Sequence, residues 1–236
     1  MLSSAEAARR ISGAPAPVLL LDTCALLDLM RDPTREAFAP IQIDVAKRLL
    51  ASARSRPRKI WLPLVAQIFA ERSDNQANVR IDATKQISRF EQRVHDVQRL
   101  FAAHGLVTTP ISPSLTTSNF PLITNSLVDT YFSESLGIRR VRDIDRRANA
   151  RMASNLAPSK KGQQTKDCIV IESYLYLAKL LREQHFTGRI VFLTSNKHDY
   201  SNPTNPGTVH PDLSAEFAAV GMAYAISFQM AEHLLK

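Results

Sequence analysis

Short, uninterrupted apolar runs alternate along the chain with longer stretches of helical periodicity. The runs at residues 17–21, 60–62 and 190–193 predict strands that are buried on both faces, as in parallel sheets. Apolar residues spaced for one helical face are found in three longer stretches, residues 34–55, 75–104 and 168–181. This alternation predicts an α/β protein with a mostly parallel sheet.

Proline, glycine and capping residues suggest where the helices begin and end. Pro63 suits the first turn of a helix that would carry Glu71. Gly105 is expected to end the long helix, and Thr165 to cap a helix whose first turn contains Asp167. Shorter elements are expected as a loop or short strands at 106–127, a helix at 126–136, a loop at 201–211, a helix at 213–220 and a last strand at 223–228.

The charge balance adds a prediction about the partner. The 236 residues contain 30 Lys and Arg against 22 Asp and Glu, which gives a formal net charge of +8. Such an excess suits a polyanion such as nucleic acid. Cys24 and Cys168 form no metal-ligand or redox motif, and no apolar run has the length of a membrane span. We therefore expect a reduced, cytoplasmic protein with no membrane partner, in one domain over residues 1–236 with a helical insertion at about 74–160.

Acidic side chains follow the predicted strands. Asp22 comes directly after the first strand, Glu71 lies on the helix after the second, and Asp167 opens an apolar helix. Asn196 and Asp199 follow the strand at 190–193. The carboxyl ends of parallel strands meet at one edge of a sheet, so we expect these groups to lie close together. Clustered carboxylates need a cation or protons among them, and Mg²⁺ or Mn²⁺ prefers such oxygen ligands. These ions activate water for attack on a phosphodiester.

Together these motifs resemble the PIN-domain nucleases. The resemblance rests on a strand ending in Asp22-Thr23, an acid on the second helix, the segment KDCIVIESYLYL and the segment VFLTSNKHDY. It spans most of the chain and is strongest for a larger PIN-like subfamily with a helical insertion. The resemblance implies a three-layer α/β/α fold and a Mg²⁺- or Mn²⁺-dependent endonuclease acting on RNA. It also implies, for some members, the role of toxin in a toxin–antitoxin pair, with an antitoxin protein as partner; a homodimer is left open.

The resemblance assigns roles to individual residues. Asp22, Glu71 and Asp167 match the first three acids of the family. Where many members have Thr-x-Asp, this chain has Thr194-Ser195-Asn196, so Asp199 or Asn196 would complete the catalytic and metal-binding set. The supporting residues would be Thr23, Glu172, Thr194 and Ser195. The residues expected to guide the RNA backbone are Arg139, Arg140, Arg142, Arg146, Arg147, Lys160, Lys161 and Lys166.

Each of these residues also has a plainer interpretation. An Asp after a strand is often a turn residue or a cap, and Glu172 could be an interior polar group. The hydroxyls of Thr23 and Thr194 could satisfy local backbone instead of orienting a carboxylate. GxGxxG and GxxxxGK[ST] motifs are absent from the sequence, which disfavours dinucleotide and phosphate-loop binding. The remaining alternative is a catalytically weak PIN-like module that binds RNA or a protein, which the uncharged Asn196 favours.

Overall fold

The computed structural model describes residues 1–35, 39–106, 115–160 and 164–236. At its centre is a parallel three-stranded sheet in which β4 lies between β1 and β7. The three strands are β1 (Val18–Leu21), β4 (Ile190–Leu193) and β7 (Met222–Ala225). All residues of β1 and β4 are buried, as expected for internal parallel strands covered on both faces. The mixed α/β class and the parallel sheet are therefore confirmed.

A second pair of parallel strands lies beside β1. It consists of β2 (Pro63–Val65) and β3 (Leu136–Ile138). The backbone N–H of Leu19 donates to the Trp61 carbonyl at 2.9 Å, and the N–H of Trp61 donates to the Pro17 carbonyl at 2.8 Å. The predicted strand at residues 60–62 is therefore displaced, and Pro63 begins a strand rather than a helix. A first strand position tolerates proline because the missing N–H costs little there.

The two faces of β4 contact different layers. Successive side chains of a strand point to opposite faces. The ring of Phe192 contacts the rings of Tyr174, Tyr200 and Phe217, which come from α7, α8 and α9. Helix α10 packs against β4, β7 and α3, and α1 packs on α7. These elements are α1 (Ser4–Gly13), α3 (Ile41–Arg54), α7 (Thr165–Glu183), α8 (Lys197–Tyr200), α9 (Pro211–Ala219) and α10 (Phe228–Leu235).

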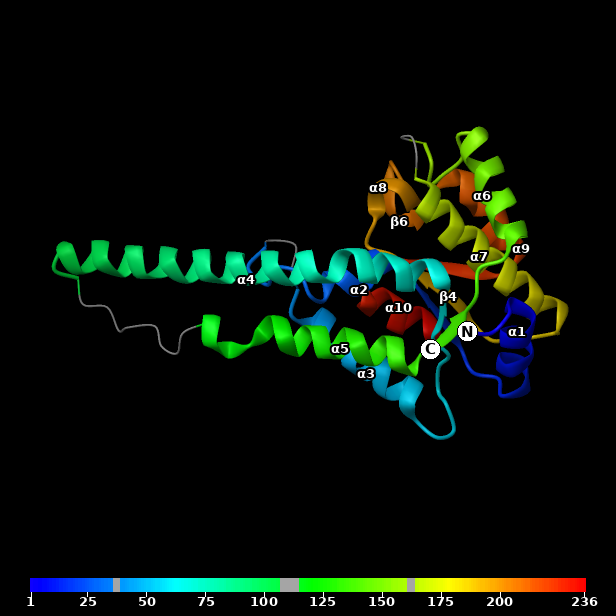
Figure 1. Ribbon diagram of the computed structural model, residues 1–236, viewed down its shortest axis with the longest axis horizontal. Coiled ribbons are helices and arrows are strands. Elements are labelled where there is room, and N and C mark those ends of the chain that lie inside the picture. The colour runs from blue at the N-terminus through cyan, green and yellow to red at the C-terminus, as the bar shows by residue number, and fades with distance from the viewer. Residues whose placement is uncertain (36–38, 107–114, 161–163) are drawn as a thin grey trace.

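Two long helices project from the sheet as an arm (Figure 1). Helix α4 (Ala66–Ala103) is 38 residues long, and α5 (Phe120–Glu134) runs beside it. The short 3₁₀ helix η1 (Thr116–Ser118) precedes α5. The helix carrying Glu71 and the helix predicted at 75–104 are thus one continuous helix. Its predicted end at Gly105 is confirmed, because this glycine adopts a φ of +73°, which favours glycine over other residues.

Several predicted boundaries are wrong for local reasons. The helix predicted from residue 34 begins at Ile41, and the expected apolar contact of Phe38 lies outside the described residues. Helix α5 begins six residues earlier than predicted, and the part of the predicted loop at 107–114 lies outside the described ranges. The loop predicted at 201–211 contains a small antiparallel hairpin, and strand β3 and helix α10 were missed. The remaining elements are α2 (Thr23–Asp28), α6 (Arg142–Ala153), β5 (Ser201–Asn202) and β6 (Asn205–Val209).

The helices of the described ranges include none whose length and apolar character would let it cross a lipid bilayer.

Candidate functional site

Asp22 lies at the carboxyl edge of the sheet and is held by two neighbouring elements. It directly follows β1 and caps α2, where its Oδ1 accepts a hydrogen bond from the backbone N–H of Thr23 at 2.7 Å. Its Oδ2 accepts a hydrogen bond from the hydroxyl of Thr194 at 2.6 Å. Thr194 directly follows β4, which pairs with β1. Strand pairing therefore fixes both oxygens of a carboxylate that is only 1% exposed.

Glu71 and Asp167 approach the same edge from two helices. Glu71 lies in the second turn of α4, is buried, and accepts a hydrogen bond from Nε2 of Gln67 at 3.0 Å. Asp167 lies in the first turn of α7, as predicted. Both line a cavity of about 470 Å³, whose other lining residues are Asn75, Gln164, Thr165 and Lys166. The predicted cap at Thr165 is wrong, because its hydroxyl donates to Sδ of Met152 and Gln164 occupies the cap position.

The charges of these carboxylates act on one another. Burial, helped by the charge of Glu71, raises the pKa of Asp22 to about 6 against the opposing hydrogen bond from Thr194. Burial, followed by the charges of Asp22, Glu71 and Asp199, raises the pKa of Asp167 to about 8. Four acids from four separate parts of the chain therefore lie close enough to repel one another. The sequence predicted this convergence from the parallel topology.

Asp199 differs from the other acids because polar neighbours surround it. Burial acts to raise its pKa, but hydrogen bonds with His198, Gln164 and Asn196 lower it to a value below the ordinary one. Nδ2 of Asn196 donates to Oδ2 of Asp199 at 2.8 Å, and Nδ1 of His198 lies 3.0 Å from Oδ1. The N–H of Asn196 donates to the Thr194 hydroxyl at 3.0 Å. Asp199 thus stays ionised at neutral pH and is connected to Asp22 through Asn196 and Thr194.

The donor set can be tested for its fit to a divalent cation. Neighbouring carboxylate charges contribute to the raised pKa of Asp22 and of Asp167, and a hard cation such as Mg²⁺ or Mn²⁺ would relieve this repulsion. Two buried oxygen atoms nearby, the Thr23 hydroxyl and Oε1 of Gln164, have no hydrogen-bond partner in the described ranges. The same ranges contain no group of three His, Cys, Asp or Glu side chains positioned to hold a metal ion. The oxygen ligands therefore fit in type and charge but are not gathered into a preformed site.

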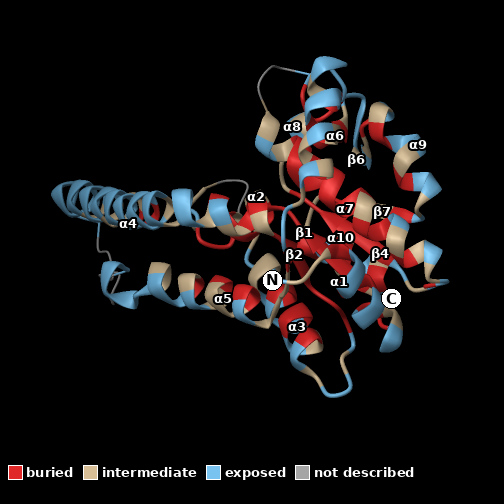
Figure 2. Cartoon of the chain, turned by 45° about the vertical axis from the view of Figure 1, so that its right-hand side comes forward, coloured by how far each residue is buried: buried red, intermediate tan, exposed pale blue. Residues whose placement is uncertain are grey.

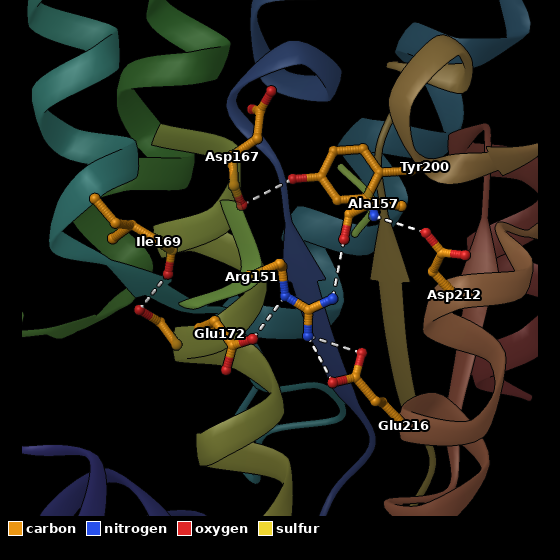
Figure 3. Close-up of polar contacts among 9 residues, drawn as sticks. Arg151, Ala157, Asp167, Ile169, Glu172, Tyr200, Asp212 and Glu216 are labelled. Atoms are coloured by element: carbon orange, nitrogen blue, oxygen red, sulfur yellow. Dashed lines mark hydrogen bonds and ion pairs between the residues drawn. The ribbon is translucent and has the colours of Figure 1, made fainter. Parts of the chain in front are cut away.

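Glu172 lies in a different environment from the acids. Its Oε1 accepts a hydrogen bond from Nε of Arg151 at 2.6 Å, and Figure 3 shows this guanidinium between Glu172 and Glu216. Arg151 also donates to both oxygens of Glu216 and to the Ala157 carbonyl, and it is buried. Glu172 is thus the partner of a buried arginine. This contact agrees with the plainer interpretation of Glu172 as an interior polar group. No local pattern of residues relates positions 151, 172 and 216, so the sequence could not reveal this network.

The predicted RNA-guiding residues lie mostly in exposed ion pairs. Arg140 pairs with Asp145, and Arg146 and Arg147 both pair with Asp143. Exposed pairs contribute about 0–1 kcal/mol and can exchange their partner for phosphate. Other pairs are Lys160 with Asp212 at 3.2 Å and Lys166 with Asp74 at 3.0 Å. Arg139 and Arg142 are exposed or partly exposed, and Lys161 lies outside the described residues.

Sequence reasoning also missed residues beside the acidic site. Gln67 and Gln164 hydrogen-bond to Glu71 and Asp199, respectively. Lys197, one residue after Asn196, and Arg31, after α2, line a cavity at the carboxyl ends of β4 and β7. Lys197 could have been found from its position in the Ser-Asn-Lys turn. The glutamines carry no signal of their own.

Comparisons of this chain with family models, with curated proteins and with solved structures found no match. The resemblance to PIN-domain nucleases therefore rests on the motifs in the sequence.

Proposed function

We propose that this chain is a Mg²⁺- or Mn²⁺-dependent endoribonuclease with a PIN-like fold over residues 1–236, in which the α4–α5 arm is the helical insertion. The observation that carries the proposal is the convergence of Asp22, Glu71 and Asp167. These acids come from three separate parts of the chain, and burial, followed by the charges of Asp22, Glu71 and Asp199, raises the pKa of Asp167 to about 8. A fold rarely retains such repulsion unless a cation or a proton-transfer function uses it.

Asp22, Glu71 and Asp167 would hold the ion, and Asp199 or Asn196 would complete the set. A bound Mg²⁺ or Mn²⁺ supplies a water of lowered pKa and positive charge for the phosphate oxygens. The chain contributes fixed ligands, because the Thr23 N–H and the Thr194 hydroxyl hold both oxygens of Asp22. Hydrolysis of the phosphodiester would leave a 3′-hydroxyl and a 5′-phosphate.

The net charge of +8 supports a polyanionic substrate, and the resemblance supports RNA. An antitoxin protein and a second copy of the chain belong to the same proposal as partners, on the strength of the resemblance.

The direct test is cleavage of labelled single-stranded RNA by the pure protein with Mn²⁺, Mg²⁺ or EDTA. Asp22→Asn and Asp167→Asn should each lower the rate by about 100-fold or more, because each removes a charged ligand. Asp82→Asn, at an exposed position of α4, is the matched control and should leave the rate unchanged. Cleavage that persists in EDTA, or in Asp167→Asn at the control rate, would reject the proposal.

The second candidate is a catalytically weak module that binds RNA. Two observations favour it: the uncharged Asn196 donates to Asp199, and no preformed group of metal ligands is present in the described ranges. RNA binding without metal-dependent cleavage would select this alternative.

A further inference from the structure

Two cavities lie on either side of the short helix α8 and share Lys197. The first has a volume of about 500 Å³ and lies between α2, α10 and the ends of β4 and β7. The second has a volume of about 470 Å³ and lies between α8 and the β5–β6 hairpin. Both have volumes typical of pockets that take small organic groups.

The first cavity combines an apolar floor with a positively charged wall. Its floor includes Leu29, Ile226 and Phe228. The side chains of Arg31, Arg35 and Lys197 supply positive charge, and Asp28 is the acid that lines it. Asp28 pairs with Arg31 at 2.7 Å and lies 3.7 Å from Arg35, so one carboxylate holds two guanidinium groups at this wall. The cavity therefore suits a ligand with a flat, weakly polar part and an attached anion.

The second cavity adds a second lysine. It is lined by Lys160 in addition to Lys197, together with His198 and His210. Burial lowers the pKa of His210, whose Nδ1 accepts a hydrogen bond from the N–H of Asp212, so this ring adds no charge. Lys160 also pairs with Asp212, and Asp199 lines the same cavity. Lys160, Lys197 and His210 come from separate parts of the chain, so their convergence is a property of the fold.

Both cavities border the acidic site. Leu193, which lines the first cavity, directly precedes Thr194, whose hydroxyl donates to Asp22. Asp199, which lines the second cavity, is linked to Asp22 by hydrogen bonds through Asn196 and Thr194. A chain that occupied both cavities would therefore pass the carboxyl edge of the sheet where the acids converge.

We propose that these cavities are consecutive nucleotide subsites, with an unpaired base in the first cavity and a backbone phosphate on Lys197. This inference rests on the proposed function. It names the substrate class as nucleic acid whose segment in the two cavities is single-stranded. A base enters a cavity of this size only when it is unstacked and unpaired, so a continuous duplex is excluded. The apolar floor receives the base, and Lys197 attracts the phosphate between the two cavities.

The experiment measures binding without cleavage. A fluorescently labelled single-stranded RNA is titrated with the Asp167→Asn protein in EDTA, and anisotropy is recorded at several salt concentrations. Lys197→Gln in this background should weaken binding about fivefold at about 0.1 M salt and reduce the salt slope by about 0.7, because one phosphate contact is lost. Lys179→Gln is the matched control, since this exposed lysine of α7 pairs with Glu183. Duplex RNA of the same sequence should bind at least about tenfold more weakly than the single strand.

The outcomes separate this inference from the proposed function. Equal affinities of Lys197→Gln and Lys179→Gln, or equal affinities for single strand and duplex, would reject the subsites even if the wild-type protein cleaves RNA with Mn²⁺. Lys197-dependent binding to a single strand, without metal-dependent cleavage by the wild type, would support the subsites and reject the nuclease. If single-stranded DNA of the same sequence binds as well as RNA, the subsites are supported, and other residues must discriminate RNA from DNA. Failure of every single strand to bind would overturn the inference.

Discussion

The sheet with its covering helices and the α4–α5 arm use helix in opposite ways. In α7, which packs in the body, 11 of 19 residues are buried. In α4, 5 of 38 residues are buried, and Ile87 is the last of them along the chain. Figure 2 shows the same contrast, with the sheet and α7 coloured as buried and the distal part of α4 as exposed. Apolar burial provides most of the favourable free energy of folding, so the body determines the stability of this protein.

The arm retains apolar residues without burying them. Past Ile87, the side chains of Phe90, Val97, Leu100 and Phe101 are exposed, although their spacing is that of one helical stripe. The sequence pattern alone makes these residues look like core positions. Amphipathic spacing therefore predicts a helix reliably, but it does not predict that another element covers the apolar face of that helix. The arm meets the acidic site at its root, where Glu71 and Asn75 line the same cavity as Asp167.

The largest expected effect is on the free energy of unfolding, which a substitution in the body should lower much more than one in the arm. Phe192 is fully buried and contacts three other aromatic rings, so Phe192→Ala should lower the free energy of unfolding by about 3–5 kcal/mol. Phe101→Ala, at a side chain that is 43% exposed, should change it by less than about 0.5 kcal/mol. Urea denaturation followed by circular dichroism measures both. Similar losses in the two variants would mean that the arm is part of the cooperative core.

The ion pairs of the body and of the arm should also differ in how much they contribute to stability. Arg151→Met leaves Glu172 buried without its cation and should destabilise the protein by about 3 kcal/mol, because an unpaired buried charge is costly. Arg99→Met removes the exposed pair with Asp96 on the arm and should cost less than about 0.5 kcal/mol. Thermal denaturation of both variants at one pH tests this. If Arg151→Met also lost less than about 1 kcal/mol, the network of Figure 3 would not be the link between α6, α7 and α9 that its contacts indicate.

The acidic site predicts how metal-free stability depends on pH. Burial and neighbouring charge raise the pKa of Asp167 from 3.8 to about 8, and that of Asp22 to about 6. The folded state therefore binds these protons more tightly than the unfolded state, and the stability gained is lost as the pH rises from about 4 to about 8. Each loss of about 1 kcal/mol lowers the melting temperature of a chain of this size by about 2–4 °C.

Melting temperatures in EDTA between pH 5 and pH 8 provide the measurement. Asp167→Asn should flatten the decline, because the amide carries no charge at any of these pH values. Asp82→Asn on the exposed face of the arm should leave the decline as steep as in the wild type. A melting temperature of the wild type that rises across this range would contradict the repulsion described for the site.

The smallest expected effect is that of a substitution near the tip of the arm on the rate of RNA cleavage. Phe101→Ser changes an exposed residue near the tip of α4 and should leave the RNA cleavage rate within about twofold of the wild type. Glu71→Gln, in the same helix but at its root, should lower that rate by about 100-fold. A large loss of cleavage in Phe101→Ser would show that the tip of the arm takes part in substrate binding.

Much of the body could be predicted from the sequence because its signals are local. The strands around Leu20 and Val191 are short apolar runs, and the order of strands and helices places Asp22 and Thr194 at one edge. The prediction failed at Pro63, where the rule for helix starts competed with the tolerance of a first strand position, and at β3, whose three residues give no periodic signal. Both segments form strands because β2 and β3 pair with each other across a long separation in the sequence.

The acids of the candidate site, together with Thr194 and Asn196, were predicted from the sequence, whereas its two glutamines were missed. An acid after a strand is visible in the sequence, and parallel topology brings such acids together. The hydrogen bonds of Gln67 and Gln164, and the buried guanidinium of Arg151, depend on distances between elements that no spacing encodes. The two cavities beside α8 are likewise a product of packing.

The continuity of α4 also has a mechanical consequence. A helix rises about 1.5 Å per residue, so Ala66–Ala103 forms a rod about 56 Å long, whereas Glu71 lies only about 7.5 Å from its start. If the rod pivots at its root, a lateral movement of about 7 Å at the tip moves Glu71 by about 1 Å. The arm is then a lever with a ratio of about seven to one, in which a weak force at the exposed end acts as a strong force on the Glu71 carboxylate close to the pivot.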